Sequence, residues 1–311
     1  MLSIEELKEA LYSVTTIPVI PFRDGRIDYA AHEKNIRYLM ENNHLSDNRP
    51  RVICIAGTSL IDHVSYEDKN KLVEIAGEIM GDEGLLLSAL TPNPIAGAGA
   101  LIETQSAMKR APDAYLLMPL GGMYSVEGLY EGFSEFGEKY GNTCGARFLY
   151  YYRQPRDREQ IVKLLNDSPH FVAVKVGTEE DDVPVMVDAI GDNAMVIWGI
   201  GDRSTKAAQV GARGHTSGIS VLVAKAGDEI NNAQRAGDFE TAFAIEKKIT
   251  ALEELRFENG REFNYSAVVE GMILSGFDDI DAGEGGPFNP RVPAEVSTRV
   301  QEAIEGILNL H

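Results

Sequence analysis

The sequence has few cysteines and no long apolar run, and each absence excludes a class of protein. Cys54 and Cys144 are the two cysteines among 311 residues, and neither belongs to a CxxC or Cys/His spacing typical of a metal site. We therefore expect both thiols to be reduced and structural. No uninterrupted apolar run approaches about 18 residues, so the sequence predicts no membrane-spanning helix.

Positive charge is scarce as well. The chain carries 29 Lys and Arg against 48 Asp and Glu, which gives a net charge of -19. Such an acidic balance argues against a surface that binds nucleic acid or anionic membranes. The first segment, MLSIEELKEALYSV, has the pattern of an acidic amphipathic helix and differs from a basic, apolar signal peptide. These features predict a cytoplasmic protein that has neither nucleic acid nor membrane as a partner.

Two patterns alternate along the chain. Short apolar runs with strand character lie at residues 15–22, 51–57, 84–90, 114–119, 147–152, 171–176, 195–200 and 214–219. Amphipathic helical stripes lie between them. The clearest stripes are Leu72, Ile75, Ala76 and Ile79, which follow a predicted Ser65 cap; Leu129, Phe133 and Phe136; and Ile161, Leu164 and Leu165, which Asp157 is expected to open.

This alternation predicts an α/β fold with a parallel sheet. About eight βα units within roughly 220 residues favour closure into a (β/α)8 TIM barrel. A doubly wound open sheet is the alternative, but GIGD (Gly199–Asp202) lacks the third glycine of the dinucleotide fingerprint. We assign residues 1–222 to the barrel and residues 223–311 to a helical C-terminal extension packed on it. The Gly/Pro/Asp-rich stretch at 276–293 is expected to connect two of its helices.

One lysine interrupts the apolar run at residues 171–176. Alternation places Phe171, Ala173 and Lys175 on one face of this strand, which we expect to line the barrel interior. The active site of a barrel lies at the carboxyl ends of its strands, and Lys175 is near such an end. Burial there lowers the pKa of a lysine and leaves free amine that attacks carbonyls. The alternative is a lysine that reaches solvent or pairs with a core carboxylate.

Polar residues end two other predicted strands. FLYYYRQPR places tyrosines one strand before Lys175, where a phenol could transfer protons during imine chemistry or could simply pack the barrel. CIAGTSLIDH ends the second strand with Gly57, Thr58 and Ser59. Two hydroxyls beside backbone N–H groups suit a carboxylate, although a turn with capping hydroxyls would look the same.

At these points the sequence resembles the dihydrodipicolinate synthase / N-acetylneuraminate lyase family of class I, Schiff-base-forming barrels. The resemblance covers essentially the whole chain. It rests on the order and spacing of IPVIPFRDGRIDYAAHEKNIRYLM, GTSLIDHVSYED, SVEGLYEGF, YYR, VAVKVGT and GARGHTSGIS. It implies a lyase that acts on pyruvate or another 2-oxo acid, with no metal or organic cofactor.

The resemblance also implies roles for single residues. Lys175 matches the Schiff-base lysine and Tyr151 the proton-transferring tyrosine, with Tyr150 as the competing assignment by one residue. Tyr152 and Arg153 occupy the Asn and Arg places of the family's Tyr-Asn-Arg variant.

The remaining matched positions concern the oxo acid itself. Thr58 and Ser59, next to Gly57, match the hydroxyl pair that holds the carboxylate of the oxo acid. Gly199 and the backbone of Thr216 match positions that line the pocket.

Departures from the family pattern narrow the activity. Leu120 and Gly121 stand where dihydrodipicolinate synthases carry a tyrosine pair, so the relay tyrosine is missing unless Tyr124 substitutes for it. Leu60 and Ile61 replace the family's Gly-Glu. These differences disfavour condensation with aspartate semialdehyde, and the Tyr-x-Arg pattern leans toward sugar-acid lyases such as 5-dehydro-4-deoxyglucarate dehydratase. Arg156 is a second candidate, beside Arg153, for contact with a distal carboxylate.

The sequence thus leaves three hypotheses in order. The first is a 2-oxo acid aldolase or sugar-acid dehydratase, with dihydrodipicolinate synthase as a lesser variant. The second is a non-catalytic member that binds an oxo acid as a sensor or interaction module. The third is a metal-dependent barrel that uses Asp62, His63 and His215. The resemblance and the helical extension predict a homo-oligomer, either a dimer or a tetramer.

Overall fold

The computed structural model describes residues 2–57 and 59–311. Within this part, parallel strands close a barrel in the order β1-β10-β9-β8-β7-β6-β5-β4. The barrel strands are β1 (Val14–Thr16), β4 (Arg51–Ile55), β5 (Gly84–Leu90), β6 (Ala114–Leu117), β7 (Phe148–Tyr152), β8 (Phe171–Val176), β9 (Met195–Trp198) and β10 (His215–Ser217). The TIM barrel predicted from the alternation is therefore confirmed.

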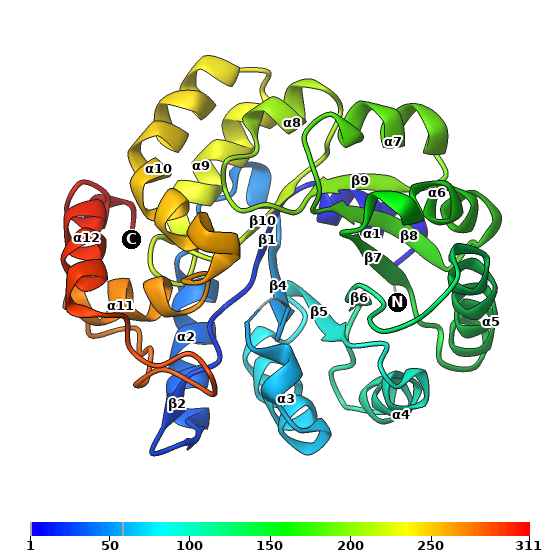
Figure 1. Ribbon diagram of the computed structural model, residues 1–311, viewed down its shortest axis with the longest axis horizontal. Helices are drawn as coiled ribbons and strands as arrows, with labels where there is room; N and C mark the ends of the chain where they lie inside the picture. Colours follow the sequence, from blue (N-terminus) through cyan, green and yellow to red (C-terminus); the bar gives the residue numbers. More distant parts are fainter. Residues whose placement is uncertain (1, 58) are drawn as a thin grey trace.

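Helices cover the outside of the barrel (Figure 1). They are α1 (Ile4–Leu11), α2 (Tyr29–Glu41), α3 (Tyr66–Met80), α4 (Ile95–Ser106), α5 (Val126–Cys144), α6 (Arg158–Asp167), α7 (Asp182–Ile190), α8 (Thr205–Gln209) and α9 (Ala224–Arg235). The predicted Ser65 cap is present, because its hydroxyl accepts the backbone N–H of Asp68 at 3.1 Å. Asp157 precedes α6 without capping it, and its carboxylate instead accepts the Tyr124 hydroxyl at 2.7 Å.

The C-terminal part is helical, as the sequence predicts. Of the residues assigned to the extension, 223–311, the first helix is α9, which also contacts β1 of the barrel. The others are α10 (Phe239–Arg261), α11 (Ser266–Ser275) and α12 (Ala294–Glu305), which contact one another on one side of the barrel (Figure 1). The Gly/Pro/Asp-rich connection lies between α11 and α12 and contains isolated β-bridges, one of which joins Gly283 to Phe22. No helix in the described ranges is long and apolar enough to cross a membrane.

The first strand is shorter than predicted. Residues 15–22 were expected to form one strand, but β1 ends at Thr16 and a separate hairpin, β2 (Phe22–Arg23) with β3 (Arg26–Ile27), follows. Pro18 and Pro21 explain the break, because proline has no N–H to give to a sheet.

The strand that carries Lys175 also departs from simple alternation. Phe171 was expected inside the barrel, but its ring packs against Phe133 and Phe148 beneath the outer helices, with ring centroids 6.3 and 5.2 Å away. The pairing with β7 accounts for this. Phe148 pairs with Phe171 and the next residue, Leu149, pairs with Ala173, so Val172 is an extra, bulged residue in β8 that moves Phe171 to the other face. Val174 and Val176 belong to the same outer cluster, while Ala173 belongs to the inner one, so alternation holds from Ala173 onward.

Candidate active site

Lys175 lies inside the barrel beside Tyr151. The two residues are paired in register on the adjacent strands β7 and β8. The ammonium nitrogen of Lys175 lies 4.1 Å from the centre of the Tyr151 ring, and the two residues are 2% and 1% exposed. Tyr150 and Tyr152 pack in the outer cluster, whereas Tyr151 packs in the inner one. Of the two tyrosines considered from the sequence, Tyr151 is thus the one beside Lys175.

Two glycines make room for this pair. A Cβ atom on Gly199 would lie 2.8 Å from Cγ of Lys175 and 2.5 Å from the Val176 carbonyl oxygen. A Cβ atom on Gly177 would lie 2.3 Å from the Tyr151 ring. The sequence resemblance pointed to Gly199, and the structure gives it a physical role. Gly177 was missed, although it directly follows the Lys175 strand.

Burial and charge act in opposite directions on these two side chains. Burial lowers the pKa of the Lys175 ammonium, an effect that Tyr151 and Cys54 partly oppose. Burial alone would raise the pKa of the Tyr151 phenol, but nearby positive charges outweigh it and lower this pKa to about 8. The largest of these charges in effect is Lys175, followed by two arginines. The site therefore makes it easier than in water for Lys175 to lose its proton and for the Tyr151 phenol to ionise.

The two arginines that act on Tyr151 are Arg153 and Arg261. Their guanidinium groups donate to the phenol oxygen over 3.4 and 3.2 Å. Arg153 was a predicted substrate contact. Arg261, at the end of α10, was missed, because nothing in the sequence indicates that this helix end returns to the barrel. The only local signal is the Asn259-Gly260 dipeptide, which predicts a turn there.

Arg156 and Tyr124 are directed elsewhere. The Arg156 guanidinium stacks on the Tyr124 ring at 4.3 Å and lies 3.7 Å from the Asp157 carboxylate. The Tyr124 hydroxyl donates to the same carboxylate. Of the two arginines considered for a distal carboxylate, Arg153 is therefore the one that contacts Tyr151.

The hydroxyl-bearing turn after β4 is bent sharply. Ala56, Gly57 and Leu60 have φ values of 69°, 30° and 52°, which are left-handed. The Ser59 hydroxyl accepts the backbone N–H of Ile20 at 2.9 Å, which leaves its proton available to a ligand. Thr58, the other predicted hydroxyl, lies outside the described residues.

Two residues predicted from the sequence, Thr216 and His215, lie on β10 in the barrel wall. Thr216 is the register partner of Thr15 on β1, and β9 separates its strand from that of Lys175. Its neighbour His215 lies 3.3 Å from Asp202, which also accepts the Ser217 hydroxyl at 2.7 Å. His63 lies against Phe288 instead, with ring centroids 5.0 Å apart and the two rings tilted. The two histidines considered for a metal are thus engaged in separate contacts.

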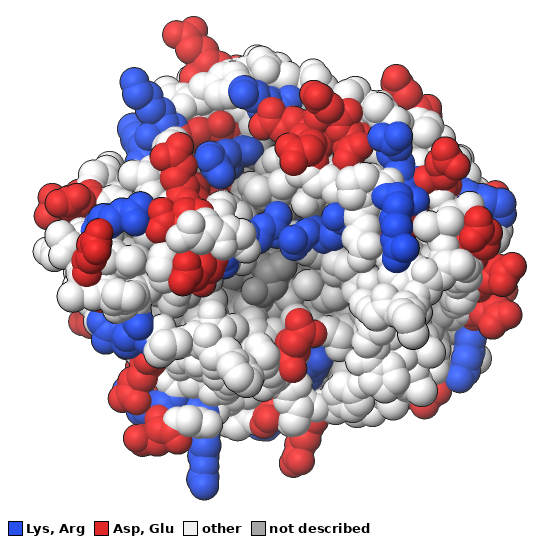
Figure 2. All heavy atoms as spheres, viewed as in Figure 1, with Lys and Arg blue, Asp and Glu red and all other residues white. Residues whose placement is uncertain are grey.

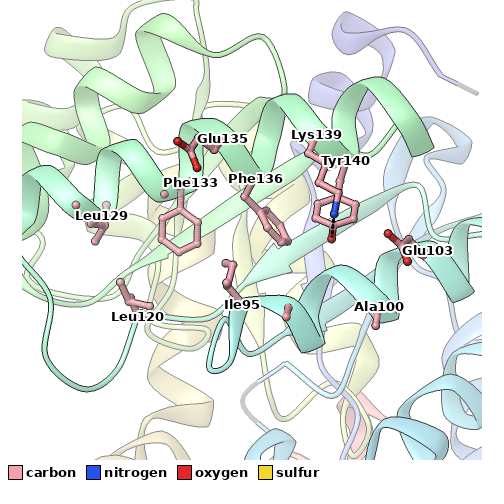
Figure 3. A pocket seen from close by; sticks show the side chains of 13 residues that line it. Ile95, Ala100, Glu103, Leu120, Leu129, Phe133, Glu135, Phe136, Lys139 and Tyr140 are labelled. Carbon is pink, nitrogen blue, oxygen red and sulfur yellow. Dashed lines mark hydrogen bonds between the residues drawn. The ribbon is translucent and has the colours of Figure 1, made fainter.

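The surface above the barrel is hollowed at its centre, and Lys and Arg side chains border the hollow along one side (Figure 2). A separate cavity of about 650 Å³ lies between α4 and α5 on the outside of the barrel. Phe133 and Phe136 face Ile95 and Leu120 across it (Figure 3). This outer cavity is mostly apolar and does not contain the residues around Lys175.

Comparison with known proteins agrees with this fold. Residues 10–282 match the dihydrodipicolinate synthetase family. A 4-hydroxy-tetrahydrodipicolinate synthase of Thermodesulfovibrio yellowstonii is 26% identical over 246 residues, which are 77% of this chain and 80% of the relative. A second protein of that name, from Halorhodospira halophila, is 26% identical over 85% of this chain and 87% of its own length. The dihydrodipicolinate synthase structure from Bacillus clausii superposes with a TM-score of 0.85 at 22% identity, covering 96% of this chain and 98% of that one.

Proposed function

Because the chain belongs to the dihydrodipicolinate synthetase family, whose members are class I aldolase-type lyases, we propose that it cleaves or dehydrates a 2-oxo acid through a Schiff base on Lys175. One observation carries this proposal. The Lys175 amine is buried against Tyr151 and, among the described residues, forms no ion pair with a carboxylate. A buried lysine without a counter-charge is costly as a structural device but suited to nucleophilic catalysis.

The chemistry follows from the two side chains. The neutral Lys175 amine adds to the keto carbon of the 2-oxo acid, and the Tyr151 phenol donates a proton to the oxygen as the carbinolamine forms. Loss of water gives the iminium, which accepts the electron pair released by C–C cleavage or by removal of the C3 proton during dehydration. After C–C cleavage, the enamine is protonated at C3. In dehydration, the enamine instead expels the C4 hydroxyl, which takes up a proton and leaves as water. Hydrolysis of the remaining imine by water then regenerates Lys175 and releases the product. No metal or organic cofactor is needed for these steps.

Other residues hold the substrate in this proposal. Ser59 and Thr58, in the turn opened by Gly57, bind the carboxylate next to the keto group. Gly199 and the backbone of Thr216 line the pocket, and Arg153 faces the part of the substrate beyond Tyr151. Support for Ser59 is its free hydroxyl proton, and support for Arg153 is its contact with the phenol.

We propose a sugar acid as the substrate in preference to aspartate semialdehyde. The support is local: Leu120 and Gly121 stand in place of the relay tyrosines, and Tyr124 is hydrogen-bonded to Asp157. A second candidate is 4-hydroxy-tetrahydrodipicolinate synthase activity, which the names of the relatives favour. Turnover assays on sugar acids, and on pyruvate with aspartate semialdehyde, distinguish the two activities.

Trapping with borohydride tests the covalent step. We expect pyruvate and borohydride to add one reduced adduct, which peptide mass spectrometry locates on Lys175. Lys69 is a matched control, because it is also buried, at 3% exposure, and lies 5.6 Å from the ring of Tyr66. Burial lowers the pKa of Lys69 too. Lys69→Ala should leave trapping intact, whereas Lys175→Ala should abolish it.

The outcomes separate the hypotheses. No adduct across a panel of 2-oxo acids, in folded protein, would contradict Schiff-base chemistry. An adduct on Lys175 without turnover of any candidate substrate would favour a protein that binds an oxo acid as a sensor or interaction module.

We also propose that the protein forms a homo-oligomer, a dimer or a tetramer, as the family resemblance suggests. Sedimentation equilibrium of the intact chain measures this directly, and a monomer at micromolar concentration would contradict it.

A further inference from the structure

Arg261 lies beside the active site because the backbone before it adopts left-handed conformations. Helical geometry in α10 stops at Glu258, and Asn259, Gly260 and Arg261 follow with φ values of 47°, 74° and 79°. Left-handed conformations are unfavourable for an arginine, and they persist where surrounding contacts hold them. Here the reversal of the chain carries the Arg261 guanidinium back to Tyr151.

Arg261 and Arg153 meet at one oxygen from opposite parts of the chain. Arg153 follows β7 and Arg261 ends α10, yet both donate to the Tyr151 hydroxyl. Each guanidinium has five N–H donors, so one bond to a phenol leaves most of them unused. Two cations beside one neutral phenol repel each other, and an anion that binds between or above them offsets this repulsion.

Neighbouring arginines of the C-terminal extension behave differently. Arg256 pairs with Glu253, Arg291 with Glu270 and Arg299 with Glu258. The chain has 48 acidic residues, so carboxylates are plentiful. In residues 2–57 and 59–311, however, neither Arg153 nor Arg261 forms an ion pair with one. Their positive charge is therefore left for a group that the chain itself does not supply.

From this juxtaposition we propose that Arg153 and Arg261 bind a second carboxylate of the substrate, so that the enzyme acts on 2-oxo diacids. The inference rests on the proposed function, because it takes Lys175 as the residue that binds the keto group. Guanidinium groups bind carboxylates through paired N–H bonds, which makes this the natural ligand of the two side chains. The C-terminal extension thus contributes a substrate-binding residue to a site otherwise built from the barrel.

A matched pair of oxo acids tests the subsite. 2-Oxoglutarate and 2-oxopentanoate have the same number of carbons and differ in whether the far end is a carboxylate or a methyl group. The concentration for half-maximal borohydride trapping on Lys175 is measured for both acids and for pyruvate. We expect wild-type protein to trap 2-oxoglutarate at concentrations about 10- to 100-fold lower than 2-oxopentanoate, the effect of one charged hydrogen-bonded contact.

The variants are Arg261→Asn, Arg261→Lys and, as the control, Arg156→Gln. Asparagine tolerates the left-handed backbone at this position and removes the charge. Arg261→Asn should remove most of the preference for the diacid, measured as the ratio of the two half-maximal concentrations within the same variant. An unchanged far-ultraviolet circular dichroism spectrum shows that the variant is folded. Arg261→Lys should keep part of the preference for 2-oxoglutarate, because lysine retains the charge but lacks the planar guanidinium group. Arg156→Gln should keep the whole preference.

The results distinguish the two proposals. If wild-type protein traps pyruvate but shows no preference for 2-oxoglutarate, or if Arg156→Gln removes the preference and Arg261→Asn does not, the subsite is wrong and the Schiff base stands. If no 2-oxo acid is trapped at all, the proposed function itself fails.

Discussion

A buried positive charge lies at each end of the barrel, and the two differ in their partners. At the start of β4, Arg51 is fully buried and forms two bonds of 2.6 and 2.7 Å with Asp228 on α9. Two more of its N–H groups donate to the carbonyl oxygens of Leu39 and Asn42. At the end of β8, Lys175 is 2% exposed and its nitrogen lies 4.1 Å from the centre of the Tyr151 ring, while Arg153 and Arg261 add positive charge nearby.

The difference separates a structural charge from a functional one. A buried ion that serves the fold alone is neutralised and hydrogen-bonded, and Arg51 has a carboxylate partner and four hydrogen bonds. Lys175 has no carboxylate partner among the described residues, and burial lowers the pKa of its ammonium. Arg153 and Arg261 add positive charge that also has no carboxylate partner among the described residues. An anionic substrate would neutralise this charge.

Removing the counter-charge of Arg51 is expected to have the largest effect on stability. Asp228→Ala leaves a buried guanidinium without its partner, which should lower the free energy of unfolding by about 3–5 kcal/mol. Denaturant unfolding of wild type and variant measures the change. The fraction of Lys175 trapped by pyruvate in the folded variant should stay the same, because the pair lies at the other end of the barrel.

The double variant Arg51→Met with Asp228→Leu is the control for this prediction. Replacing both ions by apolar side chains of similar size is often neutral, so most of the lost stability should return. If Asp228→Ala is as stable as wild type, the ion pair does not have the structural role given to it here.

Replacing Lys175 is expected to raise the free energy of unfolding, whereas replacing Asp228 lowers it. Lys175→Met replaces a poorly solvated ammonium by an apolar side chain of similar length and should raise the free energy of unfolding by about 0.5–2 kcal/mol while abolishing turnover. Because folding lowers the pKa of Lys175, the unfolded state binds more protons between this lowered pKa and 10.5, and wild-type stability rises with pH in that window. The gain from Lys175→Met should therefore be largest at low pH and shrink toward pH 10.5. A loss of stability at every pH would indicate a structural lysine.

Much of this arrangement could be predicted from sequence, and the exceptions have physical causes. Alternating periods predicted the barrel, because β and α patterns are local. Lys175 was singled out because a charged residue near the end of an apolar strand is conspicuous, and the family resemblance selected Tyr151 among three tyrosines. The structure places these two residues side by side. The position of Phe171 was wrong because the bulge at Val172 depends on how β8 pairs with β7, which the sequence of β8 alone does not encode. Arg261 was missed for the same kind of reason: its contact with Tyr151 spans 110 positions and depends on how α10 packs.

The smallest effect at neutral pH is expected at Tyr151. Its pKa is about 8 in the folded protein and near 10 in an ordinary tyrosine, so at pH 7 the phenol is neutral in both states and Tyr151→Phe should change stability little. Ionisation of the folded protein is favoured above pH 8, so the stability that Tyr151 contributes should appear between about pH 8 and 10 and be lost as the pH falls through 8. Ultraviolet difference absorbance should show one phenolate forming near pH 8 in wild type and none there in Tyr151→Phe. Lys175→Met should move this transition upward, since Lys175 is the largest of the positive charges that lower the phenol pKa. An unchanged transition would mean that the arginines alone lower the pKa of the Tyr151 phenol. The contrast between the two ends of the barrel would then depend on Arg153 and Arg261 and not on Lys175.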